Sequence, residues 1–252
     1  MKLVKFTHIK NKKFLYGKIE GTFIVPAINS IFDDKIYFSN DYKYKISSCK
    51  FYLPIKSSKI IGVAQNYKKD NNIDDPLFFL KSNNSLSLTD KKIKIPKKSK
   101  TWGESELAFV IKKKSKKNIP LNKCKEYILG YTIANDITTS YNNNNHDHHL
   151  ALSKSLDNYC PIANFIDTNF NYKNKIIEGF HNGSLIRRGN TSKLILKPYE
   201  ILSHLSSIIT LYPGDLILTG APPRMTSRKY LKKNDSYQVK ISNLGSIITT
   251  IL

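Results

Sequence analysis

Cysteine is scarce in this sequence, and its pattern excludes two kinds of cross-linked domain. The three cysteines, Cys49, Cys124 and Cys160, are odd in number and show no Cys-x-x-Cys spacing. A disulfide framework and a thiolate zinc site both need more cysteines at closer spacings. We therefore expect three reduced thiols, as is typical of a cytoplasmic protein.

Long apolar segments are also missing. No hydrophobic run approaches the roughly 18 residues of a membrane-spanning helix. The N-terminal sequence MKLVKFTHIKNKKF lacks the apolar core of a signal peptide. A hydrophobic content of 40%, with 12 Phe and 15 Tyr, is nevertheless that of a folded globular protein. These features predict a cytoplasmic protein that does not associate with a membrane.

Acidic residues and arginine are both few. The chain has 41 Lys+Arg against 19 Asp+Glu and a formal charge of +22, yet only four of its basic residues are arginine. A high positive charge suggests a nucleic-acid partner. Sequence-specific binders favour arginine, however, and here the lysines are spread along the chain in short clusters. We predict no specific nucleic-acid partner, with polyanion binding as an alternative function.

Short apolar runs bounded by Gly, Asn and Pro are the main recurring feature of the sequence. Such runs occur in residues 59–67, 76–86, 104–111 and 130–141, and they are typical of strands. We expect a further strand at residues 93–96, and short helices at residues 122–128 and 199–211. The sequence therefore predicts a mainly β (α+β) chain. It has a small β-rich N-terminal segment over residues 1–57 and a second domain over residues 58–252.

Two glutamates stand two residues apart, directly before the apolar run over residues 107–111. Side chains alternate in a strand, so Glu104 and Glu106 should project from one face with their Cα atoms about 7 Å apart. Two carboxylates about 5 Å apart repel by roughly 3 kcal/mol at an effective dielectric of 20. A proton, a basic side chain or a metal ion must offset this repulsion. For the pair alone, a solvated strand edge is the favoured interpretation.

A third carboxylate, Asp136, ends another apolar run, GYTIAN. Three carboxylates suit a hard cation such as Mg²⁺ or Mn²⁺, and they leave about three coordination positions for water or a bidentate substrate. Lys154 could add a positive charge beside them, and a salt bridge to Asp157 is its alternative role.

Seven segments, in order, resemble motifs of the fumarylacetoacetate hydrolase family. They are KIIGVAQNY, PLFFLKS, WGESELAFVI, GYTIANDIT, SKSLDNYCP, NGSLIRRGNTS and PGDLILTGAPP. The small bacterial members that process acylpyruvates and related 2-oxo acids look most similar. The resemblance covers residues 59–252. It implies a rolled mixed β-sheet with short helices, a catalytic domain over residues 58–252 and a homodimer.

The resemblance also implies a metal site. Glu104, Glu106 and Asp136 match the family's Mg²⁺ or Mn²⁺ ligands, which explains why the two glutamates lie so close together. The metal would chelate a 2-oxo acid and withdraw electrons towards the enolate oxygen. Lys154 matches the family's active-site lysine, which would stabilise the developing enolate or oxyanion.

Four further residues match positions that contact the substrate in the family. Thr219 and Gly220 match the loop that holds the substrate carboxylate, with a plain turn as the alternative. Asn66 and Tyr67 match residues that line the pocket.

The sequence departs from the family after the Asn-Tyr pair. Hydrolases of the family carry His and then Glu on a lid, and the pair activates water for carbon–carbon cleavage. This chain has the shorter stretch KKDNNIDD, in which Asp70, Asp74 or Asp75 would have to act as base. The family's Arg after Asn-Asp-x-Thr-x is Ser140, and the Thr after Thr-Gly is Ala221.

These observations predict a divalent-metal-dependent enzyme acting on 2-oxo or 1,3-dicarbonyl acids. Its reaction is either acylpyruvate hydrolysis or enol–keto tautomerisation of a molecule such as oxaloacetate. A degenerate family member with little turnover is the alternative. Because tautomerisation depends on the metal, Lys154 and a proton relay, we expect it to survive the altered lid better than hydrolysis.

Overall fold

The structure is a computed structural model that describes residues 1–67, 76–97, 99–140 and 150–252. Its strands are β1 (Lys2–His8), β2 (Asn11–Glu20), β3 (Phe23–Pro26), β4 (Tyr44–Lys45), β5 (Cys49–Tyr52), β6 (Ile60–Ala64), β7 (Leu77–Lys81), β8 (Leu86–Leu88), β9 (Lys100–Trp102), β10 (Ser105–Ile111), β11 (Ile128–Asn135), β12 (Thr138–Ser140), β13 (Cys160–Ile162), β14 (Phe165–Asp167), β15 (Ile176–His181), β16 (Ser184–Asn190), β17 (Leu216–Leu218), β18 (Ser236–Ile241) and β19 (Gly245–Thr250). Its helices are α1 (Leu150–Lys154), α2 (Pro198–Ile208) and the 3₁₀ helices η1 (Ile46–Ser48), η2 (Asn83–Ser85), η3 (Leu121–Tyr127) and η4 (Thr191–Lys193). The mainly β prediction is confirmed.

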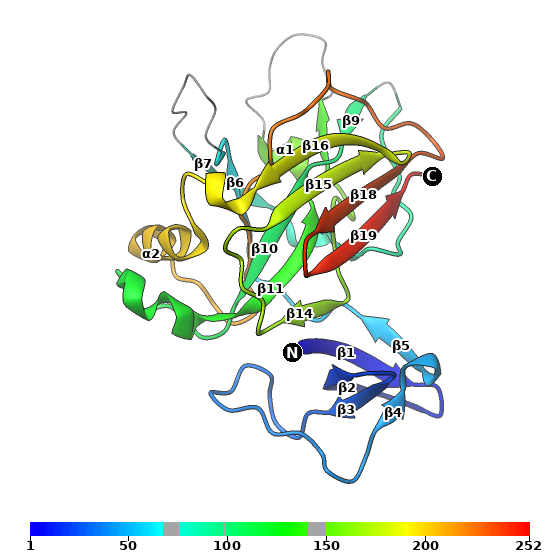
Figure 1. Cartoon of the computed structure of the whole chain (residues 1–252), viewed down its shortest axis with the longest axis vertical. Coiled ribbons are helices and arrows are strands. Elements are labelled where there is room, and N and C mark those ends of the chain that lie inside the picture. Colours follow the sequence, from blue (N-terminus) through cyan, green and yellow to red (C-terminus); the bar gives the residue numbers. More distant parts are fainter. Residues whose placement is uncertain (68–75, 98, 141–149) are drawn as a thin grey trace.

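One mixed sheet of 13 strands runs through the molecule. Its order is β4-β3-β2-β1-β14-β11-β10-β17-β6-β7, with β13 paired to β11 and β8, and β5 paired to β1. Figure 1 shows β1 to β5 at one end of the molecule, below β14. The pairing of β1 with β14 places Lys2 opposite Asp167, and the Met1 amino group contacts the Asp167 carboxylate at 3.0 Å. Residues 1–57 therefore extend the same sheet, and a domain boundary at residue 57 stays a prediction.

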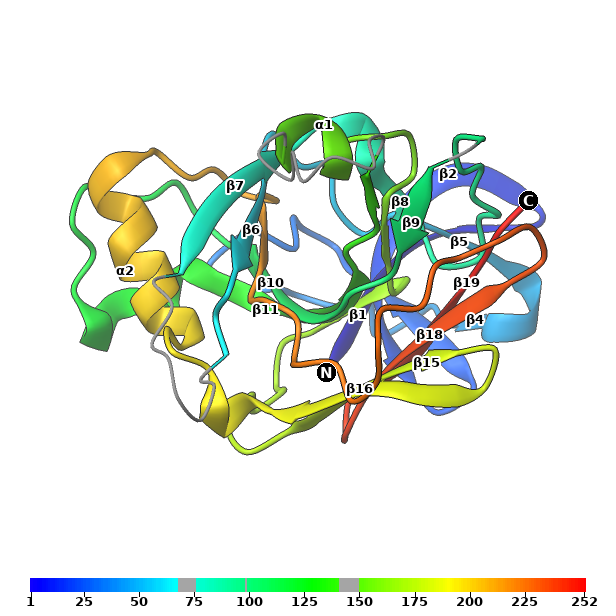
Figure 2. The same cartoon turned by 90° about the horizontal axis from the view of Figure 1, so that it is seen from above.

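The central strands β10 and β11 are covered on both faces. Every residue of β10 is buried, and so is every residue of β11 after Ile128. Seen from above in Figure 2, the two strands lie between β6 and β7 on one side and β15, β16 and β18 on the other. Burial on both faces explains why these segments read as continuous apolar runs rather than alternating ones.

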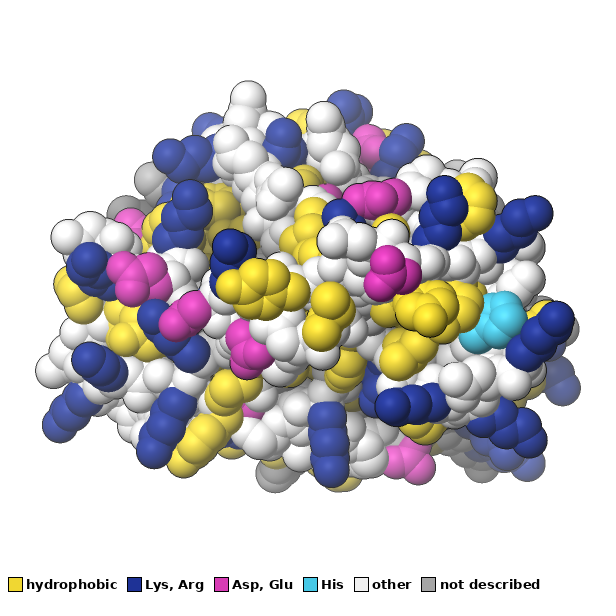
Figure 3. All heavy atoms as spheres, turned by 90° about the horizontal axis from the view of Figure 1, so that it is seen from below, with side chains coloured by type: hydrophobic (Ala, Val, Ile, Leu, Met, Phe, Trp, Pro, Cys, Tyr) yellow, Lys and Arg dark blue, Asp and Glu magenta, His cyan; other side chains and the backbone are white. Residues whose placement is uncertain are grey.

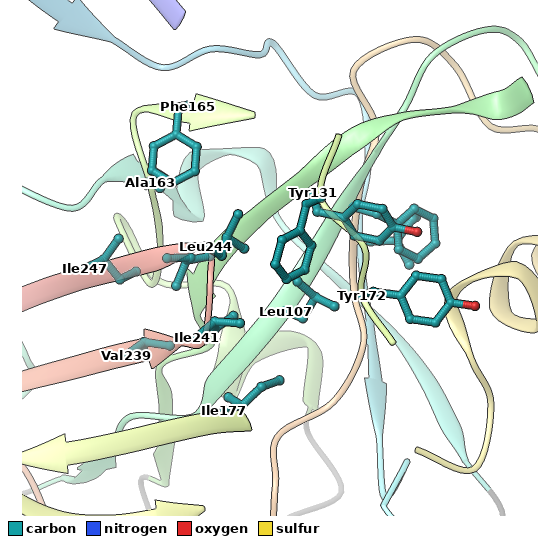
Figure 4. Packing of buried hydrophobic residues seen from close by; sticks show 14 of the residues in the cluster. Leu107, Tyr131, Ala163, Phe165, Tyr172, Ile177, Val239, Ile241, Leu244 and Ile247 are labelled. Atoms are coloured by element: carbon teal, nitrogen blue, oxygen red, sulfur yellow. The ribbon is translucent and has the colours of Figure 1, made fainter. Parts of the chain in front are cut away.

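A second sheet, with the order β16-β15-β18-β19, packs on β10 and β11. In Figure 4, Ile177 of β15 and Ile241 of β18 point towards Leu107 of β10, and all three belong to one buried cluster. The hairpin between β15 and β16 turns at Asn182 and Gly183, whose φ angles are 49° and 79°. Such a turn needs positive φ at both central residues, which Asn-Gly supplies.

The expected helices are present, and one expected strand is absent. Helix η3 matches residues 122–128, and α2 matches residues 199–211. Helix α2 lies outside β7, where His204 stacks on Phe78 with ring centroids 4.8 Å apart. The prediction of a strand at residues 93–96 is wrong, because only Ile93 pairs there, in a single β-bridge to Ile251. Pro96 has no N–H to extend that pairing.

The surface carries lysines throughout. On the face shown in Figure 3, Lys and Arg side chains stand among apolar, acidic and neutral ones without a continuous basic stripe. In the described part of the chain, no helix has both the length and the apolar character needed to cross a bilayer. The three cysteines are all unpaired, as expected.

Candidate functional site

Two neighbouring strands bring the three acidic residues together. Glu104 directly precedes β10 and Glu106 lies within it, whereas Asp136 directly follows β11. The antiparallel register pairs Ser105 with Asn135, and the Asp136 N–H donates to the Glu104 carbonyl at 2.9 Å. One carboxylate oxygen from each acid lies within 4.8 Å of the other two. The juxtaposition expected from the sequence is therefore present.

Lys154 bridges two of the acids. Its ammonium group lies 3.0 Å from Glu104 Oε2 and also donates to Asp136 Oδ2. The alternative pairing of Lys154 with Asp157 is wrong, because Asp157 accepts a hydrogen bond from Asn84 instead. The lysine is buried at the C-terminal end of α1. It is thus held against the carboxylates.

Two further basic residues reach the same acids, and sequence reasoning missed both as site residues. Lys81 Nζ, at the end of β7, lies 2.5 Å from Asp136 Oδ1 and 3.2 Å from the Tyr159 carbonyl. Arg187 of β16 donates to Glu104 Oε1 at 2.8 Å. The available signals were a lysine closing an apolar strand and an arginine in a chain that has only four.

The charges of the acids are compensated unequally. Burial raises the pKa of Glu104, but Lys154 and Arg187 outweigh it and lower the pKa to about 2. The pKa of Glu106 is instead raised well above its usual range, by burial and then by the nearby Asp136 carboxylate. Burial lowers the pKa of Lys154, but Asp136 and Glu104 outweigh it and raise the pKa above its ordinary value. Lys154 is therefore cationic.

The residues present fit a hard divalent cation. The donor set consists only of carboxylate oxygens, which Mg²⁺ and Mn²⁺ prefer. Among the residues that the structure describes, Glu106 pairs with no lysine or arginine, and its carboxylate accepts a hydrogen bond from the Gly220 N–H at 2.6 Å. A cation bound here would compensate the negative charge of Glu106, as the basic side chains do for Glu104 and Asp136.

Asn66 and Thr219 hold the loops around the site. The Asn66 side chain donates to the carbonyls of Leu196 at 2.9 Å and Thr219 at 2.8 Å, and it accepts from the Leu196 N–H at 2.7 Å. The Thr219 hydroxyl donates to the Leu107 carbonyl at 2.9 Å. Both side chains are thus engaged within the protein, and their expected contact with a substrate stays a prediction.

Gly220 and Tyr67 face Glu106. The Gly220 N–H donates a hydrogen bond to the Glu106 carboxylate. Gly220 therefore contacts the acidic cluster in addition to shaping the backbone, which the alternative of a plain turn did not include. The Tyr67 hydroxyl is buried and has no hydrogen-bond partner among the described residues. Burial, and then the Glu106 carboxylate, raise the pKa of Tyr67. Tyr67 therefore offers a neutral hydroxyl beside the acids.

Part of the expected site lies outside the described residues. This applies to the stretch that corresponds to the family's lid, including Asp70, Asp74 and Asp75. Ser140 ends β12, and Ala221 follows the Gly220 turn.

Comparison with known proteins gives consistent matches. The family model described as "Fumarylacetoacetate (FAA) hydrolase C-terminal" matches residues 57–252. An uncharacterized protein of Methanocaldococcus jannaschii is 37% identical over 213 residues, which cover 82% of this chain and 88% of that protein. The mitochondrial oxaloacetate tautomerase Fahd2a of Rattus norvegicus is 32% identical over 222 residues, which cover 82% of this chain and 70% of the relative.

A solved structure extends the likeness to the whole chain. The 5-carboxymethyl-2-hydroxymuconate delta-isomerase of Mycobacterium smegmatis superposes with a TM-score of 0.89 at 26% identity, covering 100% of this chain and 99% of that one. On the family match and the two sequence relatives, this chain belongs to the fumarylacetoacetate hydrolase family.

Proposed function

We propose that this chain is a divalent-metal-dependent enzyme that interconverts the enol and keto forms of 2-oxo acids. The observation that carries the proposal is the cluster of Glu104, Glu106 and Asp136, with the Lys154 ammonium 3.0 Å from Glu104 Oε2. The three carboxylates would hold Mg²⁺ or Mn²⁺. The bound ion would polarise the 2-oxo group as a Lewis acid.

Besides the metal ion, the Lys154 ammonium group would supply a second positive charge that stabilises an enolate. Its ammonium group has three N–H bonds, and it contacts Glu104 and Asp136 and lies 4.7 Å from the centre of the Phe79 ring. A third donor therefore remains for a substrate oxygen. Because its pKa is raised by the acids, Lys154 keeps its proton and stabilises developing negative charge. The Tyr67 hydroxyl can donate a further hydrogen bond, since its own pKa is raised by burial and by Glu106.

Two relatives support enol–keto chemistry over cleavage. One carries the name oxaloacetate tautomerase and the other the name delta-isomerase. Both reactions move a proton without breaking a carbon–carbon bond. Hydrolysis would also need a base for water, and the candidates for that role, Asp70, Asp74 and Asp75, lie outside the described residues.

The test is an assay of the Mg²⁺- or Mn²⁺-loaded protein on two substrates. We expect faster decay of enol-oxaloacetate, followed by ultraviolet absorbance, and slow cleavage of an acylpyruvate, followed by pyruvate release. Lys154→Ala should abolish both activities. Glu126→Ala, which removes an exposed carboxylate that pairs with Lys113 and Lys123, serves as the control. An acylpyruvate turnover near the typical 10 per second would contradict the preference.

Metal binding gives an independent readout. Calorimetric titration with Mn²⁺ should show one site, and Glu106→Ala should weaken it at least tenfold because a buried ligand is lost. Unchanged affinity in the Ala variants of Glu104, Glu106 and Asp136 would remove the proposed site. We also propose a homodimer, for which light scattering should give twice the chain mass of 28.9 kDa.

A further inference from the structure

Two acids of the cluster each have one carboxylate oxygen held by a donor that the fold fixes in place. Lys81, whose side chain is fully buried, lies 2.5 Å from Asp136 Oδ1. The Gly220 N–H donates to Glu106 Oε2 at 2.6 Å. An oxygen that already accepts a hydrogen bond from a fixed donor is less available to a metal ion. Each of these two acids therefore offers one oxygen, rather than two, to a cation.

Glu104, the third acid, is held in the same way by two donors. Arg187 donates to Glu104 Oε1 at 2.8 Å, and the Trp102 indole N–H donates to the same oxygen at 3.2 Å. The other oxygen, Oε2, lies 3.0 Å from Lys154 Nζ, which also donates to Asp136 Oδ2. Oε2 is therefore the oxygen that faces the cluster, whereas Oε1 is turned towards Arg187 and Trp102.

Arg187 is itself fixed in position. Its side chain is only 6% exposed, and its guanidinium group also donates to the Pro222 carbonyl at 2.7 Å. The next residue of β16, Arg188, is different, because its side chain is half-exposed and lies 3.6 Å from the Glu178 carboxylate. A buried guanidinium group with two acceptors in a fixed geometry has little freedom to leave either of them. Arg187 therefore keeps Glu104 in one orientation.

Tyr237 of β18 supports Arg187 from the second sheet. The Tyr237 hydroxyl lies 3.1 Å from the Ser105 hydroxyl, and the tyrosine is almost fully buried. Gly179 pairs with Arg187 across β15 and β16, and a Cβ at Gly179 would lie only 2.5 Å from the Tyr237 hydroxyl oxygen. Burial raises the pKa of Tyr237 to about 12, and the nearby Arg187 guanidinium acts in the opposite direction. A neutral hydroxyl thus connects the strand pair that carries Arg187 with the residue that follows Glu104.

We propose that Arg187, positioned by Tyr237, restricts Glu104 to one ligand oxygen and thereby makes the cluster select small octahedral cations against Ca²⁺. Arg187 and Tyr237 are positioning residues, since they act on the ion only through Glu104. This inference rests on the proposed function, which places a divalent ion at the cluster. Three acids that give one oxygen each leave about three positions of the octahedron that Mg²⁺ demands. Ca²⁺ takes about six to eight oxygens and uses two-oxygen carboxylates, which the donors to Glu104 Oε1 prevent.

The experiment measures Ca²⁺ and Mg²⁺ affinities by competition with Mn²⁺, whose free form is followed by electron paramagnetic resonance. In Arg187→Met, only the weaker, neutral Trp102 donor remains on Glu104 Oε1, so the carboxylate can bind an ion through both oxygens. We expect the Ca²⁺ dissociation constant, divided by that of Mg²⁺, to fall about tenfold, as is typical when a residue that orients a metal ligand is lost. Because the two ions carry equal charge, loss of the arginine charge alone changes both affinities similarly and leaves this ratio unchanged.

Two further variants complete the test. Arg188→Met removes the same charge from the neighbouring, half-exposed position and should keep the wild-type ratio. Tyr237→Phe keeps the ring and removes only the hydroxyl, so the ratio should fall by a smaller factor, and this variant decides the matter if Arg187→Met does not fold. A wild-type ratio in Arg187→Met would overturn the inference and leave the proposed function standing, whereas a wild-type ratio in Tyr237→Phe alone would overturn the role of Tyr237. A wild-type protein that binds no Mn²⁺ would overturn both the inference and the proposed function.

Discussion

Replacing Lys154 by Met should strengthen metal binding while it abolishes enol–keto activity. The Lys154 ammonium contacts oxygens of Glu104 and Asp136, the same carboxylates that would hold the ion. A cation entering this cluster must therefore share or displace the ammonium. Methionine keeps the length and apolar stem of lysine but removes the competing charge.

The size of the effect follows from the geometry. At the 3.0 Å between Nζ and Glu104 Oε2, Coulomb attraction is about 5.5 kcal/mol at an effective dielectric of 20. Only part of this opposes the metal, because a flexible lysine can keep one of its two carboxylates. If about a quarter is lost on metal binding, Lys154→Met should bind Mn²⁺ about tenfold more tightly.

Calorimetric titration with Mn²⁺ measures this directly. Lys154→Arg keeps the charge and should bind like the wild type. Lys113→Met removes a charge from an exposed pair with Glu126 and should have no effect. Weaker Mn²⁺ binding by Lys154→Met would refute the reasoning, since it would mean that the ammonium orders the ligands more than it competes for them.

Three further predictions concern the fold and the surface. Asp215 is fully buried and accepts hydrogen bonds from the backbone of Ser58 and Lys59, so Asp215→Ala should lower the free energy of unfolding by about 3 kcal/mol in urea titrations; a loss below about 1 kcal/mol would contradict this. Burial raises the pKa of Asp235, but hydrogen bonds from Asn182 and His181 outweigh burial and lower the pKa below the ordinary value of 3.8. The charged carboxylate therefore stabilises the fold above pH 3.8, and this stabilisation is lost as the pH falls through the lowered pKa of the folded state. Asp235→Asn should therefore unfold more easily than the wild type at about pH 6. The difference in the free energy of unfolding should narrow as the pH falls below the ordinary aspartate pKa of 3.8; a difference independent of pH would exclude this origin. Binding to duplex DNA should be blind to sequence and should largely vanish near physiological salt, whereas a preference above about a thousandfold would show a specific partner.

The metal-binding candidates were predictable because the information is local. Glu104 and Glu106 share a face through strand periodicity, and the apolar run after them marks the strand. Asp136 could be proposed because it ends an apolar run, but its approach to the glutamates depends on the register between β10 and β11, for which only the family motif gave support. The N-terminal strands were predicted as strands, but pairing of β1 with β14 involves residues more than 150 positions apart and leaves no local pattern.

The basic partners could not be found in this way. Lys81 reaches Asp136 from β7, which the sheet order separates from β11 by β10, β17 and β6. Arg187 comes from the second sheet. In both cases a lysine or arginine in a strand has the same sequence signature whether it faces solvent or a buried acid. Only the packing of the sheets distinguishes the two situations.

The register between β10 and β11 has a consequence for how the protein folds. All three acids lie within or directly next to this one antiparallel pair, whose strands are joined by residues 112–127, so formation of the pair brings them towards one another. A slip of one residue would turn Glu106 to the opposite face and separate it from Asp136. A divalent ion present during synthesis would therefore stabilise the correctly aligned pair before β15 to β19 are in place. The ion would then favour the correct register of β10 and β11 during folding, in addition to its proposed role in catalysis.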